Sequence, residues 1–179
     1  IAAGVLINTA GLLQAQAQQT GSETTSEVSD ILQVSTVIGY EANAFYDTPD
    51  IKNSDQLEND TITHLNASVR LAAGSDPINV SKASYTIASA ENASIVNGNN
   101  RTDGGLEYYR KQSIDEDSTI LSDQEDLMVV RFNLTSITGI SSLDQGSRLT
   151  IITQAPAGGQ SYKQAAAPKR IKEGESYIL

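Results

Sequence analysis

The sequence predicts an α+β protein, in which a long hydrophobic N-terminal helix over residues 1–30 precedes an antiparallel β-sandwich or barrel-like (immunoglobulin-like) domain over residues 31–179. Two observations lead to this prediction. No charged side chain occurs before Glu23, although the chain of 179 residues carries 22 acidic and 12 basic residues. After Gly39, short β-branched and aromatic runs alternate with turn sequences, which is typical of sandwiches and barrels.

The N-terminal segment is apolar from Ile1 to Leu13 apart from Asn8 and Thr9, and a run of Gln and Ala follows it. Gln and Ala favour helix. Thirteen residues are too few to cross a bilayer, which takes about 20. Because the chain starts inside an apolar run, we expect this segment to be the distal part of a longer hydrophobic helix.

The N-terminal segment is also expected to be surrounded by partners. A single helix that caps the β domain should keep a polar face, and residues 1–13 provide none. Glycine costs about 1 kcal/mol relative to Ala in a helix interior, so Gly4 and Gly11 indicate the close approach of another backbone. Identical segments in a filament, or a membrane, would meet this requirement. The residues expected to pack in a filament core are Gly4, Val5, Leu6, Ile7, Gly11, Leu12 and Leu13.

The remainder of the chain is expected to consist of strands. Leu32–Ile38 already mixes β-branched and polar residues, so we expect the helix to end near Asp30. The clearest alternation lies in Leu127–Thr135, where Met128, Val130, Phe132 and Leu134 share one face. Eight segments after Gly39 fit strands: Ile62–Leu71, Ala83–Ala88, Ala93–Val96, Leu106–Arg110, Leu127–Thr135, Arg148–Thr153, Ser161–Ala165 and Ser176–Leu179.

Composition argues against several classes of function. The chain has no Cys, which excludes disulfides, thiol nucleophiles and Cys-ligated metal sites. His64 is the only histidine, so a catalytic triad would depend on one residue in a strand-like run. The net charge of −10 disfavours binding to nucleic acids and to anionic membranes. We therefore expect a protein that is not an enzyme and has no cofactor.

The most distinctive motif is the N-x-Ser/Thr sequon, which occurs at six of the 11 Asn residues. Ser and Thr make up 35 of the 179 residues, so about two sequons are expected by chance. Isolated sequons also occur as ordinary polar turn and strand-face residues. As a set, they predict N-linked glycans on outward-facing positions at Asn59, Asn66, Asn79, Asn92, Asn100 and Asn133.

Two acidic clusters, Asp115–Asp117 and Asp123–Asp126, could supply oxygen ligands for Ca²⁺. Their spacing does not match the EF-hand loop, so we interpret them as solvated acidic loops and predict no metal site. The excess of carboxylates suggests a high-salt habitat.

The chain resembles the archaellins, the filament subunits of the archaeal motility organelle, whose N-terminal region is similar to that of type IV pilins. The resemblance is most specific over Ala2–Leu13 and over Val69–Asn79, and it is weak between residues 80 and 147. Further similar segments are Thr20–Ser29, Gln33-Val34 with Gly39, and the C-terminal Glu173–Leu179. The cleavage site expected for a prepilin-type peptidase is not part of the sequence.

This resemblance implies a structural subunit of the extracellular archaellum filament, which serves swimming motility. N-terminal segments would form the filament core, glycosylated β domains would form its surface, and the membrane would be a partner only before assembly. The partners would be further copies of the chain or other archaellins. Two alternatives stay open: a subunit of a related adhesion pilus, and a secreted binding module or carboxylate-based hydrolase.

Overall fold

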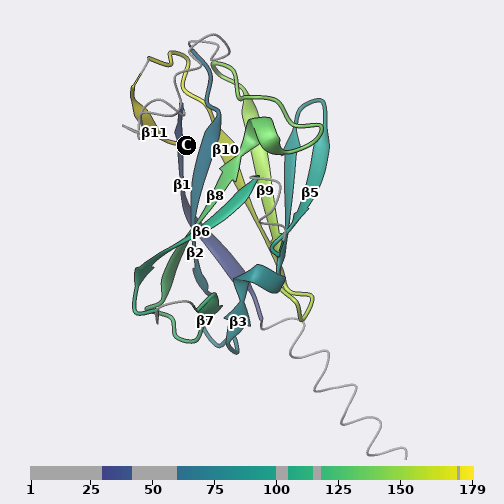
Figure 1. Cartoon of the computed structure of the whole chain (residues 1–179), viewed down its shortest axis with the longest axis vertical. Helices are drawn as coiled ribbons and strands as arrows, with labels where there is room; N and C mark the ends of the chain where they lie inside the picture. Colours follow the sequence, from purple (N-terminus) through teal and green to yellow (C-terminus); the bar gives the residue numbers. More distant parts are fainter. Residues whose placement is uncertain (1–29, 42–59, 100–104, 115–117, 173) are drawn as a thin grey trace, which may run out of the picture.

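In this computed structural model the described residues are 30–41, 60–99, 105–114, 118–172 and 174–179, and they form antiparallel sheets that pack face to face (Figure 1). The five-stranded sheet has the order β11 (Ser176–Ile178), β1 (Leu32–Tyr40), β2 (His64–Leu71), β8 (Leu127–Asn133), β6 (Leu106–Gln112). The four-stranded sheet has the order β10 (Gln160–Ala166), β9 (Arg148–Gln154), β4 (Ser84–Ser89), β5 (Ala93–Asn97). A small third sheet pairs β3 (Ile78–Asn79) with β7 (Ile120–Leu121).

One hydrophobic core joins the two larger sheets. The alternation predicted for β8 is confirmed, because Met128, Val130 and Phe132 are fully buried while Arg131 lies on the opposite face. The ring of Phe132 meets the ring of Tyr85, from the four-stranded sheet, edge to face at 5.5 Å between centroids. Aromatic pairs prefer this geometry, so the contact fixes how the sheets face each other.

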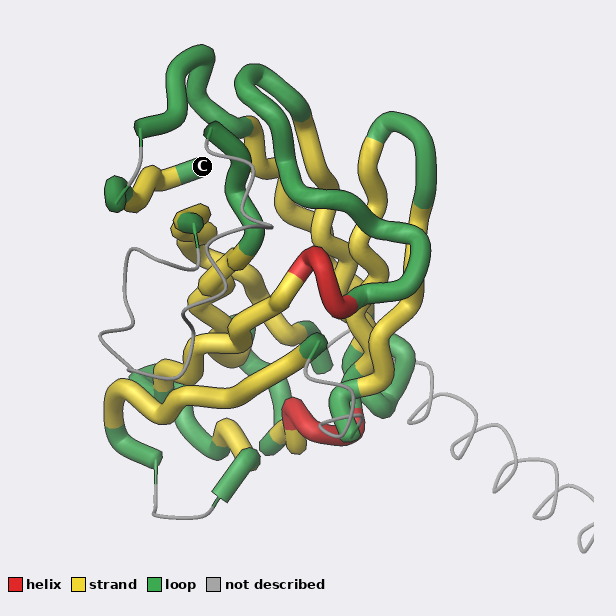
Figure 2. The backbone as a smooth tube through the Cα atoms, turned by 45° about the horizontal axis from the view of Figure 1, so that its top comes forward, coloured by secondary structure: helices red, strands yellow, loops and turns green. Residues whose placement is uncertain are grey.

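The predicted α+β fold class is wrong for the described residues, which are antiparallel all-β. Their helical structure is limited to two 3₁₀ turns of three residues, η2 (Val80–Lys82) and η3 (Leu134–Ser136), drawn red in Figure 2. The helix expected over residues 1–30 and the packing residues between Gly4 and Leu13 lie outside the described residues, except for Asp30. None of the described segments is a helix long and apolar enough to cross a membrane.

The start of β1 shows how Ile31 and Leu32, which directly follow the expected helix, are held in the sheet. The carbonyl of Ile31 accepts the N–H of Ala72 at 3.0 Å, and the N–H of Ile31 donates to Ser75 Oγ at 3.1 Å. Leu32 is fully buried opposite Leu71 of β2. Sheet pairing and core burial therefore fix the extended conformation of these residues.

All eight strands expected after Gly39 are present, with ends shifted by one or two residues in most cases. Leu127–Thr135 stops at Asn133 because η3 follows, and Ile62 forms an isolated bridge with Leu143 ahead of β2. The two-residue strands β3 and β7 were not predicted, because two residues carry no readable alternation.

Candidate functional site

The outward face of the five-stranded sheet, which we call the open face, carries a row of polar side chains across three strands. The strand register places Asn66 of β2 opposite Arg131 of β8, and Arg131 opposite Glu107 of β6. Their chain neighbours Leu65, Val130 and Leu106 point into the core. Because side chains alternate along a strand, the three polar residues share the open face.

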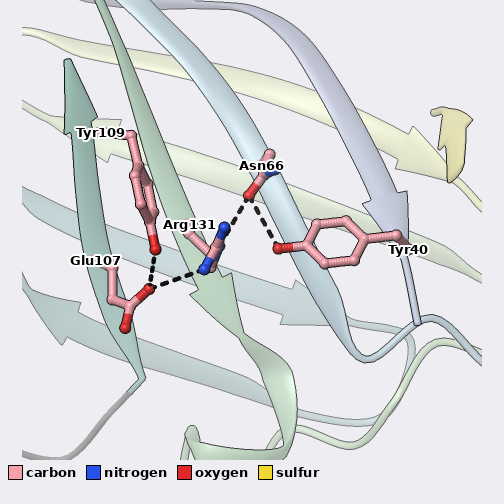
Figure 3. Close-up of polar contacts among 5 residues, drawn as sticks. All are labelled: Tyr40, Asn66, Glu107, Tyr109 and Arg131. Carbon is pink, nitrogen blue, oxygen red and sulfur yellow. Dashed lines mark hydrogen bonds and ion pairs between the residues drawn. The ribbon is translucent and has the colours of Figure 1, made fainter. Parts of the chain in front are cut away.

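Five residues form what we call the Arg131 cluster: Tyr40, Asn66, Glu107, Tyr109 and Arg131 (Figure 3). Arg131 Nη1 lies 3.1 Å from Glu107 Oε2, and the same carboxylate oxygen accepts the Tyr109 hydroxyl at 2.6 Å. Asn66 Oδ1 accepts from Arg131 Nε and from the Tyr40 hydroxyl, each at 3.4 Å. The guanidinium therefore binds a carboxylate on one side and a carboxamide on the other.

Burial shifts the pKa values of three side chains in and beside the Arg131 cluster. Burial raises the pKa of Tyr109, and the hydrogen bond to Glu107 and the charge of that residue raise it further. Burial likewise raises the pKa of Tyr40 and lowers that of His64, whose ring stacks on Tyr40 at 5.5 Å between centroids. At neutral pH the two phenols are protonated and the imidazole is neutral.

This arrangement supports the sheet and does not resemble a catalytic site. His64 Nδ1 lies 2.9 Å from Thr63 Oγ1, but Thr63 is only 4% exposed, so this hydroxyl is not placed to meet a substrate. Among the described residues, no group of three or more Asp, Glu or His side chains could hold a metal ion.

The sequon residues are spread over the domain and are not brought together. Asn92 is exposed in the turn between β4 and β5, Asn66 and Asn133 are half-buried on the open face, and Asn79 is half-buried in β3. Asn59 and Asn100 lie outside the described residues.

At the three half-buried sequons, the recorded hydrogen bonds are accepted by the carboxamide oxygen. Asn79 Oδ1 accepts from the Ser81 N–H, the Ser81 hydroxyl and the Thr119 hydroxyl, at 2.7 to 3.0 Å. Asn133 Oδ1 accepts from Thr135 Oγ1 at 2.7 Å. An N-linked glycan would be carried on the amide nitrogen, so these contacts orient the side chain without occupying the atom that is modified.

The second acidic cluster has a structural role at its last residue. Asp126 is buried, and its Oδ2 accepts the N–H groups of Ser122 at 2.6 Å and Asp123 at 3.0 Å, which closes the turn before β8. Asp123 and Glu125 are exposed, as expected for a solvated loop. The first cluster, Asp115–Asp117, lies outside the described residues.

Comparison with known proteins identifies what kind of domain this is. The family model described as archaeal-type flagellin matches residues 1–164. The chain belongs to the archaeal-type flagellin family. Flagellin B1 of Natrialba magadii is 31% identical over 185 aligned residues, which cover 99% of this chain and 85% of that protein. Flagellin B1 of Halobacterium salinarum is 27% identical, covering 100% of this chain and 84% of that protein.

Solved structures of the family share the fold. The crystal structure of archaeal flagellin FlaB1 from Methanocaldococcus jannaschii superimposes with a TM-score of 0.64 at 13% identity, over 84% of this chain and 96% of that one. The archaeal flagellum of Methanospirillum hungatei strain JF1 gives a TM-score of 0.65 at 10% identity, over 98% of this chain and 87% of that one.

The family membership confirms the archaellin resemblance found in the sequence. This flagellin is a structural subunit of the archaeal flagellar filament, outside the cell, and its partners are flagellin subunits. A structural role agrees with the expectation of a protein without catalytic activity. The expected high-salt habitat agrees with the relatives from Natrialba and Halobacterium.

Proposed function

We propose that this flagellin polymerises with its N-terminal segment in the filament core and its β-sandwich at the filament surface. The single observation that carries the proposal is the absence of any charged side chain before Glu23, in a chain of net charge −10. An unpaired charge in a packed apolar core costs several kcal/mol, whereas each fully buried Leu or Ile stabilises it by about 1.5–3 kcal/mol. Residues 1–22 meet the demands of such a core, and the charged remainder suits a solvated surface.

Within the segment, we assign the core contacts to Gly4, Val5, Leu6, Ile7, Gly11, Leu12 and Leu13. Gly4 and Gly11 are the positions where neighbouring backbones come closest, because glycine is costly unless its small size is needed. The same segment contacts the membrane before the subunit is assembled.

We further assign N-linked glycans to the filament surface, at the six sequon residues Asn59, Asn66, Asn79, Asn92, Asn100 and Asn133. The exposure of Asn92 and the outward position of Asn66 and Asn133 support this assignment. Intact-mass spectrometry of the native protein should show several glycan increments, and Asn92→Gln should remove one of them. An unmodified native mass would refute the assignment.

The packing proposal is tested by Leu12→Asp and Gly11→Leu, with the volume-conserving Leu12→Met as the matched control. Electron microscopy should show no filaments for the first two variants and normal filaments for the control, while circular dichroism shows that the β domain of all three is folded. Normal filaments of Leu12→Asp would show that the N-terminal segment is not the assembly element.

A further inference from the structure

The outward face of the four-stranded sheet is free of charge over three complete cross-strand rows. The strand registers define the rows across β10, β9, β4 and β5: Gln160–Gln154–Ser84–Asn97, Tyr162–Ile152–Thr86–Ile95 and Gln164–Thr150–Ala88–Ala93. We call these twelve residues the neutral face. Charged residues make up 19% of the chain and are normally concentrated at protein surfaces. The composition of the neutral face is therefore unusual for this molecule.

The middle row, which we call the ridge, has an apolar or aromatic side chain at every position but Thr86 and is most exposed at its two ends. Tyr162 is 78% exposed and Ile95 is 70% exposed, while Ile152 and Thr86 between them are half-buried. Tyr162 lies on β10 and Ile95 on β5, which are the opposite edge strands of the sheet (Figure 1). Two of the four large apolar side chains that are exposed among the described residues thus share one row of the neutral face, which makes this row a candidate interaction surface.

A hollow lies beside each end of the ridge. The hollow next to Tyr162 has a volume of about 420 Å³ and is lined by Ile31, Val34, Ala72 and Ser161, among others. The hollow next to Ile95 has a volume of about 190 Å³ and is lined by Gly105, Ile137 and Thr138, among others. Among the residues that the structure describes, none that lines either hollow is charged. The described surface next to both edges of the neutral face is therefore uncharged and offers recesses into which an apolar side chain fits.

The two outward faces of the sandwich differ in a second, independent way. The open face carries Glu107, Arg131 and two sequon residues, Asn66 and Asn133. The neutral face contains no sequon residue, because its one Asn, Asn97, is followed by Gly98-Asn99. Glycans at Asn66 and Asn133 would obstruct close packing of another protein on the open face, whereas the sequon nearest the neutral face, at Asn92, lies in the β4–β5 turn at its end.

We propose that the neutral face is where a neighbouring copy of this flagellin packs in the filament, with the Ile95 edge of one copy against the Tyr162 edge of the next. This contact rests on the proposed polymerisation. Each copy carries a net charge of −10, so copies repel each other least where they meet through a surface without carboxylates. A contact between opposite edges is heterologous, and heterologous contacts build open helical assemblies, whereas a self-paired contact closes a dimer.

The absence of Cys from the chain makes cross-linking a clean test. Ile95→Cys and Tyr162→Cys are combined in the full-length chain, assembled into filaments and oxidised. We expect a ladder of disulfide-linked dimers, trimers and longer products on a non-reducing gel. Each single variant should lack the ladder, as should the matched pair Arg70→Cys with Lys111→Cys, at exposed positions of β2 and β6 in the five-stranded sheet.

Charge variants give a second readout that does not depend on disulfide geometry. Ile95→Glu and Tyr162→Glu place a carboxylate on exposed positions of the neutral face, and Gln112→Glu does so on the exposed end of β6. Ile95→Glu and Tyr162→Glu should raise the salt concentration below which filaments fall apart. Gln112→Glu should leave this concentration unchanged. Thermal unfolding of the β domain should be the same for all three variants. Filaments that form normally but give no ladder and no such shift would refute this contact alone. A wild-type chain that forms no filaments would instead refute the proposed polymerisation, and the contact with it.

Discussion

The guanidinium carbon of Arg131 lies 4.3 Å from the ring centroid of Tyr109, on the open face of the five-stranded sheet. Tyr109 in turn donates to Glu107 Oε2, the oxygen that Arg131 Nη1 also contacts. The stacking and the two polar contacts thus join β6 to β8 in one unit. The side chain of Arg131 is 14% exposed and that of Glu107 is 52% exposed, so water reaches one partner much more than the other.

Arg131→Leu should lower the free energy of unfolding by about 1–2 kcal/mol, because it removes the cation–π contact and the ion pair together. Arg131→Lys keeps the charge but not the planar guanidinium, so it should recover only part of the loss. Glu107→Gln alone should cost less than about 1 kcal/mol, since an exposed ion pair is largely screened. Unfolding of the three variants in denaturant measures the order of these losses. An Arg131→Leu variant as stable as the wild type would contradict the prediction.

His64 should make stability depend on pH in the mildly acidic range. Burial lowers its pKa in the folded state below the ordinary value of 6.5. As the pH falls from above 6.5 to that lower value, the unfolded chain binds a proton that the folded chain does not, so stability falls, by at most about 1.4 kcal/mol per pH unit. His64→Gln should reduce the difference in the free energy of unfolding between pH 7.5 and pH 5.5. Equal slopes for both proteins in chemical denaturation would show that His64 is not the titrating group.

Gly98→Ala should be strongly destabilising. A Cβ at this position would lie 2.6 Å from the carbonyl oxygen of Val80 and 2.7 Å from that of Ala83, and backbone atoms cannot move away cheaply. We expect a loss of more than about 2 kcal/mol. Gly146→Ala is the matched control: its site is open, and only its φ of +72° opposes a side chain, at a cost of about 1 kcal/mol. Thermal melts followed by circular dichroism compare the two, and similar melting temperatures would contradict the expected order.

The packing of the two sheets against each other should depend on two hydroxyl groups that bind the beginning of β1. Thr153 Oγ1 and Ser161 Oγ, both from the four-stranded sheet, lie 2.8 and 2.6 Å from the carbonyl oxygen of Leu32 and 2.7 Å from each other. Each hydroxyl has one proton, so one donates to the carbonyl while the other donates either to the same carbonyl or to its partner hydroxyl. Thr153→Val keeps the shape and should cost about 1 kcal/mol, because Ser161 still satisfies the carbonyl. Adding Ser161→Ala should cost more than the sum of the single changes, since the buried carbonyl then loses both side-chain donors. Additive losses in the double-mutant cycle would show that the two donors act independently.

Filaments should loosen in dilute buffer and tighten in salt. The net charge of −10 repels neighbouring domains over a long range at low ionic strength, and physiological salt screens this repulsion within about 8–10 Å. Sedimentation of native filaments across a salt series measures the released subunit fraction, with sucrose of matched osmolarity as the control. If the same fraction of subunits were released from dilute to molar salt, charge repulsion between subunits would not control filament stability.

Local patterns predicted most of the strands correctly. The alternation of Met128, Val130 and Phe132 is visible in the local sequence, and it places Arg131 on the outward face without any tertiary information. The turn after β2 contains Gly74 at a φ of +85°, a conformation that favours glycine over other residues. Ile31 and Leu32, which directly follow the helix expected over residues 1–30, show the limit of such patterns, because their pairing with Ala72 and Leu71 depends on a strand far along the chain.

The sequence by itself determined the class of the protein: its acidity, the charge-free beginning, the sequons and the family motifs at Ala2–Leu13 and Val69–Asn79 are all properties of the chain. Only the tertiary structure decided which strands are neighbours. Asn66 and Arg131 are 65 residues apart in the chain, and Thr86 meets both Ile95 and Ile152. The Arg131 cluster and the neutral face both depend on such registers. Side-chain alternation is set by the local backbone, whereas register is set by the burial of a whole core, which no short segment encodes.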